Sequence, residues 1–190
     1  MSQLPSQSGA STASEYSPAE RELLLRLVHR AIDARLSGTD LDLTPPTDHL
    51  AEQRGAFTTL HLHGSLRGCI GYVLPVASLY RTIAETAVGA AFDDPRFPPV
   101  DPTEAPELEA EISVMSPLFP VRPDEIEIGK HGLLVALDGR RGLLLPQVPL
   151  EHAWDRETFL SETCRKARLP ADAWRRGAQL QAFTAEIFSE

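Results

Sequence analysis

The sequence predicts an α+β fold in which antiparallel strands are mixed with three principal helices. Three stretches carry apolar residues at helical spacing, one near the N-terminus, one in the middle and one in the last third of the chain. Stretches that alternate apolar and polar residues lie between them, and turn residues join several of these as hairpins. Residues 1–16, rich in serine and glutamine, are expected to form a disordered tail before a domain that spans 17–190.

The first helix has a local signal at each end. Ser17 supplies an N-cap, Pro18 suits the first helical position and Glu20 completes a capping box. Apolar residues then share one helical face as far as Gly38, which is expected to end the helix. A proline-containing linker follows.

The central part of the chain alternates between strand and helix signals. Residues 55–73 predict a β-hairpin around Gly64, and the alanine-rich stretch 77–91 predicts a second helix that an Asp-Pro dipeptide stops. From 107 to 115, apolar residues alternate with glutamates and a serine, which indicates a half-buried strand.

The C-terminal part repeats this mixture. Residues 133–137 and 141–145 flank an Asp-Gly turn and are predicted to form a hairpin. Asp155 is expected to cap the third helix. Residues 180–188 alternate and are predicted to form one last strand.

Composition and motifs exclude several classes of function. A net charge of −9 argues against generic nucleic-acid binding, which needs a basic surface. Two cysteines without a Cys-x-x-Cys spacing, no apolar run long enough for a membrane span and no signal sequence lead us to expect a cytoplasmic protein without membrane contact. The nucleotide-binding glycine motifs, the zinc-protease motif and the serine-hydrolase elbow are all missing from the sequence.

The segment from Leu66 to Gly71 is the strongest candidate site. It holds Cys69 between Gly68 and Gly71, and strand alternation would place Arg67 on the face of the thiol. A nearby cation favours the thiolate, the nucleophilic form of cysteine. The alternative is a buried cysteine whose neighbouring glycines serve packing alone.

Whether His61 faces this thiol depends on the turn. A two-residue Gly64-Ser65 loop would pair Leu60 with Cys69 and turn His61 away. A three-residue loop that ends at Gly64 would pair His61 with Ser65 and place it on the face of Cys69, and we favour this second turn. His61 and its neighbour two residues on are too few ligands for a metal, so neither a metal nor another cofactor is expected.

The ordered motifs of the chain resemble the AMMECR-domain family, also called AmmeMemoRadiSam system protein A. The resemblance spans about residues 18 to 188, and the stretches that carry it are Gly55 to Leu60, Leu66 to Gly71, Asp94 to Pro99, Glu111 to Pro117, Gly129 to Leu133, Leu143 to Val148, Trp154-Asp155 and Lys166-Ala167. Two positions depart from the family pattern, since Ala153 and Arg168 stand where glycine is usual. The resemblance implies two unequal lobes built on antiparallel sheets flanked by helices, with a cleft between the lobes.

Three further residues are candidates for the same site. Family position favours Glu111, whose carboxylate is suited to act as a base or to neutralise an arginine. Arg96, between prolines, is either a loop-ordering ion pair or an anion anchor, and His131 lies in a predicted loop. The catalytic candidates are Cys69, Glu111 and His61, and the candidate ligand-binding residues are Arg67, Gly68, Gly71, Arg96 and His131.

Three functions are consistent with these residues. In the first, the resemblance implies an accessory protein that acts with Memo-like and radical SAM proteins and binds a small molecule, a peptide-like ligand or a partner in a cleft centred on Arg67 and Cys69. In the second, Cys69 is the nucleophile or thiol carrier of an enzyme, with His61 or Glu111 as base. In the third, the chain is an interaction module and Cys69 is structural. We rank them in this order, because the sequence holds no recognised catalytic triad or cofactor motif.

Overall fold

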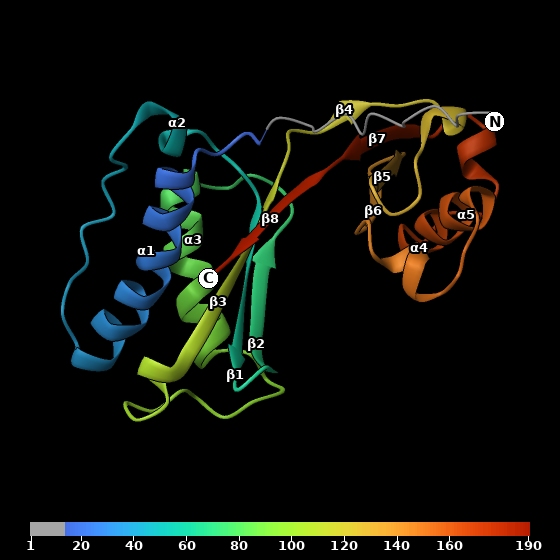
Figure 1. The fold of residues 1–190 in the computed structure, drawn as a ribbon. Coiled ribbons are helices and arrows are strands. Elements are labelled where there is room, and N and C mark those ends of the chain that lie inside the picture. Colours follow the sequence, from blue (N-terminus) through green and yellow to red (C-terminus); the bar gives the residue numbers. More distant parts are fainter. Residues whose placement is uncertain (1–13) are drawn as a thin grey trace, which may run out of the picture.

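Two lobes, each built on a four-stranded antiparallel sheet, make up the fold (Figure 1). The structure is a computed structural model, and it describes residues 14–190. The α+β class and the two unequal lobes expected from the sequence are confirmed. Within the described residues, no helix combines the length and apolar character that crossing a membrane requires.

The larger lobe has strand order β2-β1-β3-β8, with α1 and α3 on one face of the sheet (Figure 1). Its capping box forms as predicted, because the Ser17 side chain accepts from the Glu20 amide and the Glu20 carboxylate accepts from the Ser17 amide. Gly38, with φ of 68°, ends α1. The elements are α1 (Pro18–Ser37), α2 (Asp48–Ala51), β1 (Ala56–Leu62), β2 (Ser65–Tyr72), α3 (Leu79–Phe92), a 3-10 turn (Ala105–Glu107), β3 (Leu108–Met115) and β8 (Ala185–Ser189).

Strand alternation sets the two faces of this sheet. Leu60 and Ile112 are fully buried and face the helices, whereas Thr59 and Glu111 are partly exposed on the opposite face. We call this second face, which carries Phe57, Thr59, His61, Cys69, Glu111, Ser113 and Ile187, the open face. No helix of the described chain packs on it in the way that α1 and α3 pack on the other (Figure 1).

The smaller lobe has strand order β4-β7-β5-β6, and α5 packs against β5 and β6. Phe159, Leu160 and Cys164 of α5 are buried in its core against Leu133 and Val135. The predicted Asp-Gly hairpin joins β5 to β6, and Asp155 caps α5 as expected. The elements are β4 (Phe119–Pro120), a 3-10 turn (Pro123–Glu125), β5 (Gly132–Leu137), β6 (Arg140–Leu144), α4 (Val148–Glu151), α5 (Arg156–Lys166), a 3-10 turn (Ala173–Arg175) and β7 (Gln179–Phe183).

The single last strand expected over 180–188 is divided at Thr184. β7 ends before this residue in the smaller lobe, and β8 begins after it in the larger lobe (Figure 1). The Thr184 amide donates to Ser116 Oγ at 2.9 Å, and the Ser116 amide donates to the Thr184 carbonyl at 2.9 Å. Alternation continues across the break, so the sequence pattern does not reveal that the chain changes sheets.

The boundary of the expected tail also needs correction. Tyr16 is only 1% exposed and stacks on His49, with ring centroids 4.8 Å apart. The amides of Glu15 and Tyr16 donate to the Glu186 carboxylate at 2.7 and 3.3 Å. Residues 14–16 therefore belong to the folded domain, and residues 1–13 lie outside the described residues. Tyr16 is a single aromatic residue in a polar segment, so the sequence shows no hydrophobic periodicity there that would predict this docking.

The two departures from the family pattern lie in the conformation that glycine favours. Ala153 has φ of 52°, and Arg168, which follows α5, has φ of 57°. The Leu169 amide donates to the Cys164 carbonyl at 2.9 Å, so the helix still closes with the usual C-terminal hydrogen bond. The turn geometry is kept, although a residue other than glycine adopts the left-handed backbone conformation at each position.

Candidate functional site

The hairpin that carries the Cys69 segment differs from both predicted turns. His63 and Gly64, with φ of 52° and 75°, form a two-residue turn, and Leu62 lies opposite Ser65. The register then shifts, since His61 lies opposite Leu66 but Leu60 lies opposite Gly68. The expected pairing of His61 with Ser65 is wrong, and so is the alternative pairing of Leu60 with Cys69.

The shift leaves Arg67 as the extra residue of a β-bulge. His61 still reaches the face of Cys69, because Thr59 lies directly opposite Cys69 and His61 is two residues from Thr59 on the same strand. The predicted face of His61 is therefore found, but through a different turn and a bulge. Its partner in the weighed metal pair, His63, is in the turn with its Nε2 3.3 Å from a Glu107 carboxylate oxygen.

Cys69, Thr59 and Glu111 form one row across three strands of the open face. Thr59 pairs with Cys69 on one side and with Glu111 on the other. Its Oγ1 donates to Cys69 Sγ at 3.3 Å. Neighbouring strands are about 4.8 Å apart, so the backbones of Glu111 and Cys69 are separated by roughly 10 Å. The Glu111 side chain would have to span this distance to take the thiol proton.

Arg67 is placed differently from the expectation. Its side chain is only 9% exposed, and Nη2 donates to Glu104 Oε2 at 2.8 Å. This hydrogen bond also lowers the pKa of Glu104. The alternation that would have put the guanidinium beside the thiol fails at the bulge, so Arg67 is accounted for by a buried ion pair.

The outer edge of β2 is capped beside Cys69. Asp94 Oδ2 accepts from the Cys69 amide at 2.9 Å, and Arg96 Nη2 donates to the Cys69 carbonyl at 3.5 Å. The two side chains also pair with each other, with Arg96 Nη2 and Asp94 Oδ2 2.7 Å apart. Arg96 holds the pKa of Asp94 well below its ordinary range, and Asp94 chiefly, with Cys69, raises the pKa of Arg96. Of the two roles weighed for Arg96, the geometry matches the loop-ordering ion pair.

The two glycines beside Cys69 leave no space for a ligand. A Cβ on Gly68 would lie 2.0 Å from the Ala90 carbonyl oxygen of α3. A Cβ on Gly71 would lie 2.3 Å from the ring of Phe57. Close approach of the chain to itself explains both glycines, in line with the packing alternative.

His131 lies in the other lobe. It is only 7% exposed, and its Nδ1 accepts from the Glu127 amide at 3.1 Å. Its ring meets that of Phe119 edge-on, with centroids 5.7 Å apart, and burial lowers its pKa. Its contacts are those of a histidine that orders the loop before β5, and they do not join it to Cys69.

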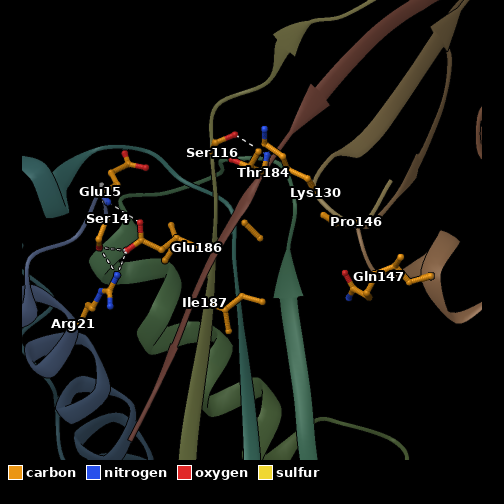
Figure 2. Close-up of a pocket in the computed structure, with 14 residues that line it drawn as sticks. Ser14, Glu15, Arg21, Ser116, Lys130, Pro146, Gln147, Thr184, Glu186 and Ile187 are labelled. Atoms are coloured by element: carbon orange, nitrogen blue, oxygen red, sulfur yellow. Dashed lines mark hydrogen bonds and ion pairs between the residues drawn. The ribbon is translucent and has the colours of Figure 1, made fainter. Parts of the chain in front are cut away.

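A cavity of about 620 Å³ lies between the lobes (Figure 2), and neither Cys69 nor Arg67 lines it. The larger lobe contributes the start of β8 and the segment at Ser14, and the smaller lobe contributes the loop before α4. The expected cleft between lobes is therefore present, but it is not centred on the Cys69 segment. Sequence reasoning missed its lining because those residues come from five separate stretches of the chain: Ser14, Glu15, Arg21, Val114, Ser116, Gly129, Lys130, Pro146, Gln147, Leu150, Thr184, Ala185, Glu186 and Ile187.

Two residues around Cys69 were also missed as participants. Thr59 lies within a stretch that carried the resemblance, but only its pairing reveals the hydrogen bond to Cys69. Asp94 had the sequence signal of a helix stop, and its bond to the Cys69 amide joins positions 25 residues apart. Neither contact has a signal in local periodicity.

Known proteins resemble the chain over most of its length. The AMMECR1 family model matches residues 25–188. Protein MK0488 of Methanopyrus kandleri is 44% identical over 183 residues, which cover 90% of this chain and 88% of that protein. Protein TK0174 of Thermococcus kodakarensis is 44% identical over 184 residues, which cover 89% of each chain.

A solved structure also resembles this fold. The crystal structure of the uncharacterized protein PH0010 from Pyrococcus horikoshii has 42% sequence identity to this chain and a TM-score of 0.70. The match covers 89% of this chain and 90% of that one. Given the family match and these relatives, the chain belongs to the AMMECR1 family.

Proposed function

We propose that this protein is an accessory binding protein that presents the open face around Cys69 to a ligand or partner. On this proposal it acts in the cytoplasm with Memo-like and radical SAM proteins, and the difficult chemistry belongs to them. The observation that carries the proposal is the row of Cys69, Thr59 and Glu111 on a sheet face that α1 and α3 do not cover.

The hydrogen bond at the thiol favours binding over proton-transfer catalysis. Thr59 Oγ1 donates to Cys69 Sγ, so the threonine is not placed to accept the thiol proton. A general base acts within about 2.6–3.2 Å of the proton that it takes. Glu111 is two strands away from Cys69, at several times that distance across the sheet.

A cysteine-dependent enzyme is the second candidate. Cys69 is partly exposed, and its carbonyl and amide are held by Arg96 and Asp94. A rigid strand with a hydrogen-bonded sulfur is also what a thiol nucleophile or carrier needs. This candidate requires a base from the substrate, a partner or a movement of His61.

Alkylation distinguishes a functional thiol from a structural one. Iodoacetamide is reacted with the native chain across a range of pH, and modification at each cysteine is followed by mass spectrometry. Cys164 is the internal control, because it is fully buried and burial raises its pKa. We expect Cys69 to react at least about tenfold faster than Cys164 in the native chain. If native Cys69 reacts no faster than Cys69 of the unfolded chain, the cysteine is structural.

Binding is tested with purified partners. The wild-type chain, Cys69→Ser and Glu111→Gln are titrated against a Memo-like and a radical SAM protein from the same genome. Substitution on the open face is expected to weaken binding by about tenfold or more, equivalent to about 1.4 kcal/mol. Cys164→Ser is the control variant, because its side chain is in the core of the smaller lobe. Equal affinities for all variants would contradict the proposal.

A further inference from the structure

The two outer edges of the larger sheet differ in whether side chains bind their outward backbone groups. On β2, the outward amide and carbonyl of Cys69 are bound by Asp94 and Arg96. On β8, the Ser116 amide donates to the Thr184 carbonyl and the Glu190 amide donates to the Ala110 carbonyl. These two bonds show that the even-numbered residues of this segment direct their backbone groups toward β3. Antiparallel residues alternate in the direction of their backbone groups, so Ala185, Ile187 and Ser189 point theirs away from β3.

Those outward groups form an unprotected strand edge. The hydrogen bonds within residues 14–190 leave the amides and carbonyls of Ile187 and Ser189 without a partner. Natural sheets usually protect such an edge with lysine, proline, a bulge or a covering segment. Residues 185–189 contain neither lysine nor proline, their register with β3 is unbroken, and the central Ile187 is 58% exposed.

The cavity between the lobes lies along this edge (Figure 2). Ala185, Glu186 and Ile187 line one side, and Pro146, Gln147 and Leu150 of the smaller lobe line the other. Leu150 is 59% exposed, so apolar side chains are available on both walls. A volume of about 620 Å³ is within the range of sites that hold ligands.

We propose that the β8 edge and this cavity bind an extended peptide of a partner protein as a fifth strand of the larger sheet. Backbone hydrogen bonds to Ile187 and Ser189 hold the peptide, and its apolar side chains contact Ile187 and Leu150. The smaller lobe forms the far wall of the cavity, which leaves room for one segment and not for the four-stranded sheet of a second copy.

Charge favours a basic peptide. The chain has a net charge of −9, which attracts cationic peptides over a long range. The charged side chains that line the cavity are already paired, since Arg21 pairs with Glu186 at 2.9 Å, Glu15 pairs with Arg54 at 2.6 Å and Lys130 pairs with Glu127 at 2.8 Å, so the preference rests on the net charge. This site is at the opposite edge of the sheet from Cys69, so it goes beyond the proposed function and is tested without the thiol.

The probe is a short synthetic peptide of alternating threonine and valine with lysine at both ends. Its binding to the full chain is measured by fluorescence anisotropy, and amide hydrogen exchange is measured with and without it. We expect exchange at Ile187 and Ser189 to slow by about tenfold or more at saturation. The same peptide with alternate amides N-methylated, which cannot donate to β8, is expected to lose binding.

Variants locate the site. Ile187→Pro removes an outward amide that holds no bond to β3, and Ile187→Lys places a charge at the centre of the edge. Each variant is expected to weaken the binding of the peptide by about tenfold or more, while circular dichroism shows that the chain stays folded. Val76→Lys is the control, because Val76 is 64% exposed and follows β2, at the opposite edge of the sheet from β8.

Three results would overturn the proposal. The first is no binding of the peptide at millimolar concentration, and the second is equal binding of its N-methylated form. The third is an edge already covered in the free chain, seen as slow exchange of Ile187 and Ser189. If that protection comes with a dimer that Ile187→Lys dissociates in sedimentation, the edge belongs to a second copy.

Discussion

Asp94 takes the place of a neighbouring strand beside Cys69. Its Oδ2 accepts from the Cys69 amide at 2.9 Å, as a strand carbonyl would, and Arg96 supplies the matching donor to the Cys69 carbonyl. Asp94 is almost fully buried, with a side chain 2% exposed. The ion pair of Asp94 and Arg96 thus protects this sheet edge and fixes the backbone of Cys69.

Replacing this carboxylate is expected to destabilise the larger lobe. Asp94→Asn keeps the side-chain volume but removes the charge that binds the Cys69 amide and Arg96. We expect a loss of about 2 kcal/mol at neutral pH, the range for hydrogen bonds to charged groups. Urea unfolding measures it, and Asp93→Asn, at the neighbouring position, is the control. A loss no greater than that of Asp93→Asn would contradict this role.

The same pair predicts a pH dependence. Arg96 lowers the pKa of Asp94 in the folded state, so the stabilisation is complete above the unfolded pKa of about 3.9. It is lost as pH falls from there through the lower folded pKa. The stability difference between wild type and Asp94→Asn should be constant from pH 7 to 5 and shrink below about pH 4, as measured by urea unfolding at each pH.

The glycines of the Cys69 segment should differ in their tolerance of alanine. Gly68→Ala drives a Cβ into the Ala90 carbonyl of α3, a backbone atom that cannot move alone, and should cost about 3 kcal/mol. Gly71→Ala meets the base of the Phe57 ring at 2.3 Å and the Ala56 carbonyl oxygen at 2.5 Å, a backbone contact less close than that at Gly68, and should cost about 2 kcal/mol. Thermal unfolding ranks the two. The reverse order would mean that the strand, not α3, limits the site.

The two departures from the family pattern predict stabilising substitutions. Arg168→Gly and Ala153→Gly relieve a left-handed backbone that costs other residues about 1–2 kcal/mol, against an entropic cost for glycine of about 0.5–1 kcal/mol. Each variant should gain about 0.5–1 kcal/mol in urea unfolding. Arg165→Gly, inside α5, should instead lose about 1 kcal/mol. A loss in all three variants would show that the left-handed positions are not strained.

Tyr16 should be as important as a core residue. It is 1% exposed and packs on His49 and Phe188, so Tyr16→Ala should cost about 3–5 kcal/mol. Tyr72→Ala is the matched control, because Tyr72 is 42% exposed. Deleting residues 2–13, which are poor in apolar side chains, should leave the melting temperature nearly unchanged. Equal effects of the two tyrosine variants would refute the docking of residues 14–16.

Local signals in the sequence were enough to predict most elements. The capping box of Ser17 and Glu20 acts within one helical turn, and the alternation of β3 acts between adjacent residues. The Asp-Gly turn between β5 and β6 is likewise decided by two residues that tolerate positive φ. Each of these preferences is expressed by the segment itself, so one sequence suffices to predict it.

The tertiary structure decided the register, the site and the last strand. The bulge at Arg67 lets that side chain reach Glu104, 37 residues away, while Gly68 packs against α3. The break at Thr184 depends on Ser116, 68 residues earlier, and the docking of Tyr16 depends on Glu186. A one-residue shift of register changes every side-chain contact of a strand, so packing between distant segments determines it. The sequence by itself determined the elements and the family resemblance, and these long-range contacts decided which side chains surround Cys69 and which edge of the sheet is left open.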